Sequence, residues 1–550
     1  MRWTIPFRTV ALSLLALCFP GAYSQSNTAD QPAASQQPAS DQPPMTLRTN
    51  TRLVVVDVVA VDSKGQPVPD LKAADFTLLE DGKPQKISGF NFEHPGAAPA
   101  LVALAQLPPS VVTNAPKFQS NSLNVILFDT VNGEFSEHAY ARDQLLKFLN
   151  TADLGRPVAI FALQNQLKLL HDFTTDNKSL SAAVAKYKPP AQTINSESIE
   201  SRASAFTTRG DYHTSERGIE TTLNQLNALA KVLAGFPGRK NLIWLSESFP
   251  LTLYPESMGQ ANMDGQSLKS NSQAGVGQSV SQNLQRNAPY RSYADLVKKV
   301  SDSLMAAQVA VYPVDAGALG KDDHLGSQHT MDSMAESTGG KSFKNSNDLA
   351  LGLRTSIEDG ATYYTLTYYP ENKKWDGLYR TIQVKSGRSN LSLRYREGYY
   401  AVDPEKTNKE DADAVAENFS RSLELDAPAA TQVLFQAQIE PPSEKNKKVV
   451  VTFHIDPRTL AFERKDGGME SARLSCTVWA YGKDKDKPAM SSGTVNANLK
   501  ASEYQLMMQQ RFLPCDRQLE LKPGTYALRM GVLDRATNKI GTASAQVVVP

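Results

Sequence analysis

The polar residues that could do chemistry form no catalytic constellation in this 550-residue sequence. His171 and Asp172 are adjacent, but no motif places a serine or cysteine beside them to be activated. The signatures His-Glu-x-x-His, Gly-x-Ser-x-Gly and the Walker lysine loop do not occur. One group of metal-ligand types matches no known site spacing and fits a solvated loop better; it consists of Asp322, Asp323, His324 and His329. We therefore predict a protein that is not an enzyme, with a hydrolase as the alternative.

Cys476 and Cys515 are the two cysteines that remain when the N-terminal segment is set aside. In an oxidising compartment they could form a disulfide. Its loop of about 40 residues would then stabilise the fold by roughly 3–4 kcal/mol. Two buried free thiols are the alternative.

The first 24 residues resemble a cleavable export signal. Arg2 and Arg8 give a basic start, and the apolar run 10–19 is shorter than the roughly 20 residues that span a bilayer. Small residues precede a cleavage point after Ser24. We expect residues 1–24 to be a signal peptide, and an uncleaved membrane anchor is the alternative. The mature protein would have no transmembrane segment and would be periplasmic, surface-associated or secreted.

Composition is that of a soluble globular protein. Hydrophobic residues make up 41% and charged residues 21% of the chain. The formal net charge of +1 gives no attraction towards nucleic acid. A chain this long exceeds one ordinary core, so we expect about three or four domains.

The segments before residue 120 predict a spacer and a small β unit. Residues 25–45 are rich in Gln, Pro, Ser and Ala and predict a disordered linker. Residues 46–95 contain a β-branched run at 53–61 and the Asp81-Gly82 signal of a tight hairpin turn. This N-terminal β unit is too small to bury a core alone. A Pro- and Ala-rich stretch at 95–120 separates it from the next pattern.

Residues 119–360 alternate short apolar runs with helix-period segments. Such alternation predicts a mainly parallel sheet covered by helices on both faces. The predicted strands are 124–128, 157–163, 241–245 and 309–314. The predicted helices are 136–149, 214–234, which is the clearest, a segment that follows the capping box Ser292-x-x-Asp295 and carries Leu296, Val300, Leu304 and Ala307, and 345–359. Residues 253–291 predict a long loop, either a functional lid or a plain surface insertion.

The pattern changes to period two after residue 360. Residues 361–402 predict strands that could pair with the N-terminal β unit, which would make the α/β domain an insertion into a β-sandwich; tandem domains are the alternative. Tyrosine pairs at 363–364 and 368–369 resemble a sugar- or peptide-binding stripe, although alternate strand residues would face the core. Residues 403–426 predict a charged linker, and 427–550 a C-terminal β-sandwich-like domain.

Several segments between about 50 and 401 resemble, in the same order, the von Willebrand factor A-related domain proteins described from acidobacteria. The resemblance implies a von Willebrand factor A-type fold, that is, a Rossmann-like, doubly wound, mainly parallel sheet, here flanked by β-sandwich-like domains. The matching stretches are LVVVDVVAVDSKGQPVPDLKAADFTLLEDGKPQKI (53–87), NVILFDT (124–130), GRKNLIWLSESFP (238–250), VAVYPVDAGAL (309–319), STGGKSF (337–343) and YYTLTYYP…REGYYA (363–401).

The resemblance also implies a divalent-cation site after the first strand of the α/β domain. Its motif is Asp-x-Ser-x-Ser, because Mg²⁺ prefers about six hard oxygen ligands. Asp129 matches the first position, but Val131 and Gly133 stand where the serines would be. A threonine and an aspartate from later loops usually complete such a site.

Thr221 or Thr222 could supply that threonine, and Glu247 stands in place of the aspartate. One interpretation is a degenerate site in which Asp129, Thr222 and Glu247 weakly bind Mg²⁺ or another divalent cation. The other is a metal-free sheet edge at which Asp129 caps the following turn. Under both, the ligand-binding edge comprises Asp129, Thr130, Thr221, Thr222 and Glu247.

These observations predict an exported, non-catalytic protein-interaction or adhesion module. It would bind a protein or peptide partner at the carboxyl edge of the α/β sheet. A structural envelope component, in which the β domains make the contacts, is the main alternative.

Overall fold

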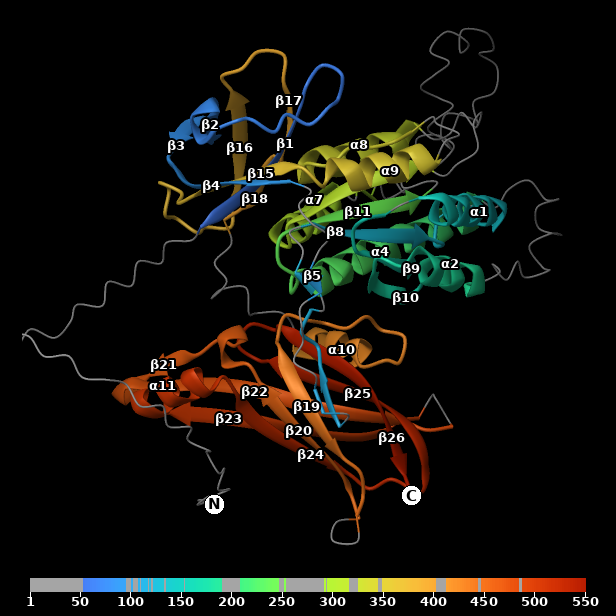
Figure 1. Cartoon of the computed structure of the whole chain (residues 1–550), viewed down its shortest axis with the longest axis vertical. Helices are drawn as coiled ribbons and strands as arrows, with labels where there is room; N and C mark the ends of the chain where they lie inside the picture. The colour runs from blue at the N-terminus through green and yellow to red at the C-terminus, as the bar shows by residue number, and fades with distance from the viewer. Residues whose placement is uncertain are drawn as a thin grey trace, which may run out of the picture. The chain divides into compact units, whose positions relative to one another are not determined.

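The computed structural model divides the chain into Met1–Asn50 and Thr51–Pro550 (Figure 1). The predicted signal peptide 1–24, the linker 25–45 and nearly all of the predicted loop 253–291 lie outside the described residues. The structure describes residues 53–94, 100–101, 107–108, 110–116, 118–119, 122–132, 135–152, 154–189, 208–246, 252–253, 291–292, 294–315, 325–344, 349–401, 412–443, 447–483 and 487–550.

The middle of the chain forms a five-stranded sheet in the order β10-β9-β8-β11-β14. Neighbouring strands pair in parallel, except that β10 is antiparallel to β9. The strands are β8 (Ser122–Asp129), β9 (Val158–Leu163), β10 (Leu167–Thr174), β11 (Arg239–Ser246) and β14 (Val309–Asp315). All residues of β8, β9 and β11 are buried, as expected for strands covered on both faces.

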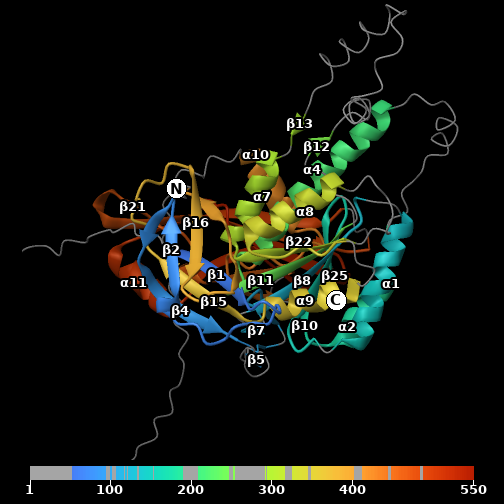
Figure 2. The same cartoon turned by 90° about the horizontal axis from the view of Figure 1, so that it is seen from above.

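Helices cover both faces of this sheet because its apolar side chains alternate between them. Val125 and Leu127 of β8 belong to one core cluster, and Ile126 and Phe128 to another. The first cluster includes residues of α4 (Thr208–Leu233), α7 (Ala294–Ala306) and α8 (Leu325–Thr338), and the second includes α1 (Phe135–Thr151), α2 (Asn177–Lys186) and α9 (Leu349–Asp359) (Figure 2).

The prediction of a mixed α/β domain with parallel strands is confirmed, but three of its elements were missed. Edge strand β10 is mostly half-buried, so it lacks a continuous apolar run. Helix α2 is short, and α8 has too weak an apolar stripe for a periodicity signal.

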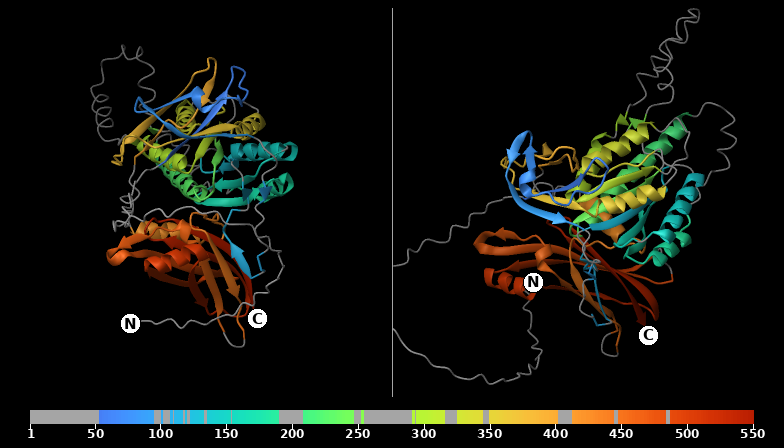
Figure 3. Two further views of the ribbon diagram at one scale, coloured as in Figure 1. Left: turned by 60° about the vertical axis from the view of Figure 1, so that its left-hand side comes forward. Right: turned by 45° about the horizontal axis from the view of Figure 1, so that its top comes forward.

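The N-terminal β unit and the strands after residue 360 share two sheets and one core. Their strand orders are β17-β1-β15-β4 and β18-β16-β2-β3, and their core residues pack together. We call this pair of sheets the N-terminal sandwich; its strands are β1 (Val54–Val61), β2 (Phe76–Glu80), β3 (Lys83–Gln85), β4 (Ile87–Glu93), β15 (Tyr363–Tyr368), β16 (Tyr379–Ser386), β17 (Ser392–Arg394) and β18 (Gly398–Tyr400). The α/β domain is therefore inserted between its two halves (Figure 3).

The predicted Asp-Gly turn joins β2 to β3. Glu80 pairs with Lys83, so Asp81 and Gly82 are the two turn residues, with φ values of 48° and 77°. Positive φ at both positions matches the twist of a tight antiparallel hairpin.

Two further sheets share a core in the C-terminal region, which we call the C-terminal sandwich. One has the order β24-β20-β19-β6, and the other the order β21-β22-β25-β26 with β23 on β22. Its elements are β6 (Val111–Thr113), β19 (Phe435–Glu440), β20 (Val449–Ile455), β21 (Glu463–Lys465), β22 (Met469–Tyr481), β23 (Ala489–Leu499), α11 (Ala501–Gln510), β24 (Leu513–Leu519), β25 (Gly524–Asp534) and β26 (Ile540–Val549).

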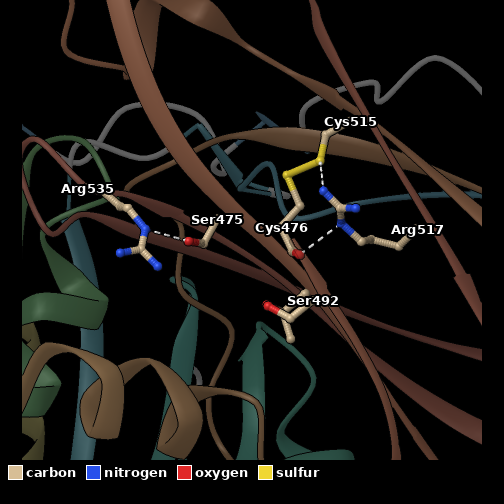
Figure 4. The surroundings of a disulfide bond; sticks show 7 residues. Ser475, Cys476, Ser492, Cys515, Arg517 and Arg535 are labelled. Atoms are coloured by element: carbon tan, nitrogen blue, oxygen red, sulfur yellow. Dashed lines mark hydrogen bonds between the residues drawn. A yellow bond between two sulfur atoms is a disulfide. The ribbon is translucent and has the colours of Figure 1, made fainter. Parts of the chain in front are cut away.

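A disulfide between Cys476 of β22 and Cys515 of β24 links these two sheets (Figure 4). Both cysteines are buried. Arg517 donates from Nε to the Cys476 carbonyl oxygen at 3.1 Å, and its Nη2 lies 3.4 Å from Cys515 Sγ. The Arg517 guanidinium thus packs against the disulfide that links the two sheets.

Two predictions about connecting segments are wrong. The stretch 95–120 does more than separate the N-terminal β unit from the α/β domain. It contains β6, which pairs with β19 and so belongs to the C-terminal sandwich. Asn114 fixes it there: its Nδ2 donates to the carbonyls of Ala430 and Val433 at 2.9 and 2.8 Å, and its Oδ1 accepts from Phe435 N at 2.9 Å.

The predicted linker 403–426 contains helix α10 (Ala412–Ser422). Its Phe419 packs with Leu423 and Leu533 in a small apolar cluster. Charged residues dominate the rest of the segment and hide this short stripe in the sequence.

The remaining short elements are β5 (Ala100–Leu101) with β7 (Phe118–Gln119), β12 (Thr252–Leu253) with β13 (Arg291–Ser292), and the 3₁₀ turns η1 (Ala73–Asp75), η3 (Pro457–Thr459) and η4 (Asp466–Gly468). No helix in the described part of the chain combines the length and apolar character needed to cross a membrane.

Candidate functional site

The carboxyl edge of the parallel sheet brings together polar residues from several elements. Strands β8 and β11 run in parallel register, with Phe128 opposite Leu245. Asp129 ends β8 and Ser246 ends β11, so both reach the same edge. Helix α1, which follows β8, belongs to one core, and α7, which precedes β14, belongs to the other. The nearest described helices of these two strands in the chain, α1 and α7, therefore pack on opposite faces of the sheet.

Asp129 is the buried centre of this edge, with 2% of the residue exposed. Its Oδ1 accepts hydrogen bonds from the backbone N–H groups of Val131 and Asn132 at 2.9 and 3.2 Å. Its Oδ2 accepts from Ser246 Oγ at 2.7 Å and from Trp244 Nε1 at 3.3 Å. The carboxylate therefore caps the turn after β8 and joins it to the end of β11.

Asn132 connects Asp129 to the long helix α4. Its side-chain Nδ2 lies 2.8 Å from Asp129 Oδ2 and 2.8 Å from Thr222 Oγ1, and it donates to both oxygens. Thr222 is fully buried. One amide group thus joins an oxygen atom of β8 to one of α4, and Asn132 lies 90 residues before Thr222 in the chain.

Two neighbours fix the position of Asn132. His138 Nε2 lies 2.8 Å from the Asn132 carbonyl oxygen, which anchors the backbone of the turn to α1. A side chain at Gly218 of α4 would place its Cβ 3.2 Å from Asn132 Oδ1 and 3.7 Å from Val131 Cγ1. The absence of a side chain at Gly218 leaves room for the amide.

Burial shifts the pKa of acidic groups at this edge. Loss of hydration raises the pKa of the Asp129 carboxyl above its ordinary value, and the hydrogen bonds from Asn132, Ser246 and the turn backbone act in the opposite direction. Burial also raises the pKa of the nearby Tyr187 phenol.

The other residues of the predicted ligand edge do not join the cluster. Thr130 Oγ1 donates to the Leu163 carbonyl at 2.8 Å and lies 3.4 Å from the Tyr187 hydroxyl, so it belongs to the β9 side. Thr221 is half-buried beside Thr222. Glu247 lies outside the described residues. The structure thus brings together Asp129 and Thr222 of the predicted set.

The donor set of the described residues does not fit a divalent cation. Val131 and Gly133 offer no side-chain oxygen, and Asn132 Nδ2 stands within hydrogen-bond distance of both Asp129 Oδ2 and Thr222 Oγ1. A cation at that place would meet N–H donors instead of lone pairs. Among the described residues, no group of three or more His, Cys, Asp or Glu side chains is arranged to hold a metal.

The other candidates from the sequence do not form a second site. Asp322, Asp323 and His324 lie outside the described residues, as does the side chain of His329. His171 is half-buried on β10, with Nδ1 at 2.6 Å from the Asp172 carbonyl oxygen. Three of the four paired tyrosines are buried, and only Tyr369 is largely exposed, so the pairs are mainly core and not a binding stripe.

Sequence reasoning missed Asn132, Trp244, Ser246 and His138 as members of this cluster. Asn132 follows Asp129 by three residues, a spacing common in side-chain-capped turns, and this was the available signal. The partners from α4 and β11 depend on tertiary packing and leave no local pattern.

Comparisons with known proteins give weak likenesses only. No protein-family model matches the chain, and no curated protein matches it. The vWF domain of the type V pili tip protein Mfa5 from Porphyromonas gingivalis is 12% identical, over 43% of this chain and 93% of that chain, with a TM-score of 0.24. Protein BatB from Bacteroides thetaiotaomicron is 11% identical, over 44% of this chain and 98% of that chain, with a TM-score of 0.20.

The PilB minor pilin from Streptococcus sanguinis is 10% identical, over 44% of this chain and 60% of that chain, with a TM-score of 0.23. Such low identities and TM-scores carry no argument about fold or function. The proposals below rest on the geometry of the chain itself.

Proposed function

We propose that the protein is an exported, non-catalytic interaction module that binds a protein or peptide partner at the carboxyl edge of its parallel sheet. The observation that carries this proposal is the position of the Asp129–Ser246 cluster, at the carboxyl ends of two parallel strands whose nearest described helices, α1 and α7, pack on opposite faces of the sheet. Ligand sites of open α/β sheets lie at such points. On the segments matched in the sequence, the α/β domain is of the von Willebrand factor A type, resembling the acidobacterial proteins, and its metal site is degenerate to the point that the edge is metal-free.

A binding role suits the chemistry of this edge better than catalysis. Asp129, Asn132 and Ser246 hydrogen-bond to one another, and within the described residues they form no pair of nucleophile and base. Such a closed network fixes the shape of the turn after β8. A preformed turn lowers the entropy lost when a partner binds.

The disulfide in the C-terminal sandwich supports export. Disulfides persist in oxidising compartments and are rare in the cytosol. The Cys476–Cys515 bridge therefore suits a protein that works in the periplasm, at the surface or outside the cell.

Val131 offers a direct test, because it is half-buried beside the cluster and its backbone is held by Asp129. A phage-displayed library of random peptides is selected on the immobilised full chain, and the selected peptides are titrated against Val131→Glu. We expect the variant to weaken their binding at least ~10-fold, as for an interface residue near the centre of a contact.

Lys178→Glu provides the matched control, because Lys178 is exposed on α2, away from the edge cluster. It should leave binding unchanged, and circular dichroism should show that both variants fold. Equal binding of the selected peptides to wild type and Val131→Glu would refute the edge proposal. That result would favour the alternative in which the sandwiches make the contacts.

A further inference from the structure

We propose that the side-chain amide of Asn132 takes the place of a divalent cation at the sheet edge, so that this edge keeps its shape without metal. The amide nitrogen lies 2.8 Å from each of two oxygen atoms, Asp129 Oδ2 and Thr222 Oγ1. A cation would join a carboxylate and a hydroxyl through their lone pairs. The two N–H bonds of one amide join the same pair by hydrogen bonds.

The orientation of the amide follows from its partners. Both oxygens of Asp129 accept hydrogen bonds, Oδ1 from the turn backbone and Oδ2 from Ser246 and Trp244, so the NH₂ group and not the Oδ1 atom of Asn132 faces Asp129. On the other side, Gly218 leaves space next to Oδ1, where a Cβ would come within 3.2 Å. A turn of the amide would place two oxygens against each other at 2.8 Å.

The arrangement explains how Asp129 stays buried beside apolar strands. A buried charge is costly unless it is paired or hydrogen-bonded. Here Asn132, Ser246 and Trp244 supply donors to Oδ2, and the turn backbone supplies donors to Oδ1. The carboxylate therefore needs no metal to be stable in this position.

Substitution of Asn132 tests the inference by opening the cation position. Mn²⁺ is titrated into the full chain, and the loss of the free-Mn²⁺ electron paramagnetic resonance signal measures binding. Wild type should bind no Mn²⁺ at this site up to about 1 mM, the weak end of protein sites for divalent ions. Asn132→Asp, which places a second carboxylate beside Asp129, should show saturable binding and a higher melting temperature with Mn²⁺.

Asn132→Ser is the second variant, because it offers a hydroxyl ligand without adding charge, and it should also gain Mn²⁺ binding. Asn91→Asp is the matched control: Asn91 also donates to a carboxylate, that of Glu93, but on the exposed surface of β4, and the variant should gain no site. The readout requires no partner, so it is independent of the peptide-binding test.

Two results would overturn the inference. One is saturable Mn²⁺ binding by wild type that Asp129→Asn abolishes, which would mean that the amide yields its place to a metal. The other is the failure of both folded Asn132 variants to bind Mn²⁺, which would mean that the position is not a latent cation site.

Discussion

The Glu80 carboxylate and the Arg380 guanidinium form an ion pair inside the N-terminal sandwich, at 3.3 Å and with 2% of each side chain exposed. The hydroxyls of Tyr368 and Tyr399 donate to Glu80 Oε2 at 2.7 and 2.8 Å. Glu80 and Arg380 lie on β2 and β16, one from each half of the sandwich that the α/β domain separates in sequence. The ion pair therefore links the two halves of the N-terminal sandwich.

Glu80→Gln should destabilise the protein by about 3–5 kcal/mol, because it leaves the buried Arg380 charge without its carboxylate. The free energy of unfolding is measured by urea titration of wild type and variant. Asp70→Asn is the control, since Asp70 pairs with Arg388 at 2.8 Å on the surface and solvent screens that pair. A large decrease in the free energy of unfolding of the control, or no decrease in Glu80→Gln, would contradict a stabilising role of the Glu80–Arg380 pair.

Replacing both Cys476 and Cys515 by alanine should lower the free energy of unfolding by about 4 kcal/mol, as the loop-entropy relation gives for this sequence separation of 39 residues. Because both sulfurs are buried, reductant should cleave the bridge slowly in the native protein and rapidly in denaturant. Thiol labelling with and without denaturant measures both rates. Rapid native-state labelling would show that the bridge is accessible.

Asn114→Ala should cost about 3 kcal/mol, because it leaves the buried carbonyls of Ala430 and Val433 and the N–H of Phe435 without their partner. Hydrogen exchange should then speed up in β6 and at its pairing with β19. Asn496→Ala, at an exposed position on β23, should change neither quantity. Unchanged exchange in β6 would mean that backbone pairing alone holds the strand.

Lys240 should make stability depend on pH above neutrality. Its side chain is 1% exposed, and burial lowers its pKa from 10.5 to about 7, while Asp57 acts in the opposite direction. Between these values the unfolded chain binds the proton and the folded chain does not, so stability rises as pH increases from 7 to 10.5. Below pH 7 the cost of the buried charge is fully present.

Lys240→Met removes that titration and should flatten the increase in the free energy of unfolding between pH 7 and 10. Urea titrations at several pH values measure the two profiles. Parallel profiles for wild type and variant would show that Lys240 keeps its proton in the folded state or finds a counter-charge there.

The sheet of the α/β domain could be predicted because its strands are continuous apolar runs that stop at polar residues. Asn124 to Phe128 and Asn241 to Leu245 are buried in this way. The Asp81-Gly82 turn could also be predicted from the sequence, since few residue pairs accept positive φ at both positions. These signals are local in the sequence, and the strands and the turn form where they predict them.

The wrong or missing parts depend on distant contacts. Strand β6 has three residues and no pattern of its own, and β19, more than 300 residues later, makes it a strand. Thr130 and Thr222 are chemically equivalent in the sequence, but packing turns Thr130 towards β9 and Thr222 towards Asn132. The replacement of a cation by an amide depends on distances of 2.8 Å that no residue pattern encodes.

Both sandwiches contain early strands that pair with strands much later in the chain, and this order constrains the sequence of folding steps. Strand β1 pairs with β15, Val54 opposite Tyr368, and β6 pairs with β19, so neither early segment can find its partner until most of the chain has emerged. Pairings this distant in sequence form slowly, and unpaired strands are prone to aggregate. The α/β domain, whose strands are contiguous in the chain, can fold first and bring Gly360 and Ser122 together, 2.8 Å apart through the serine hydroxyl. The N-terminal sandwich therefore closes late, and its early strands stay open to wrong pairings until β15 and β16 have been made.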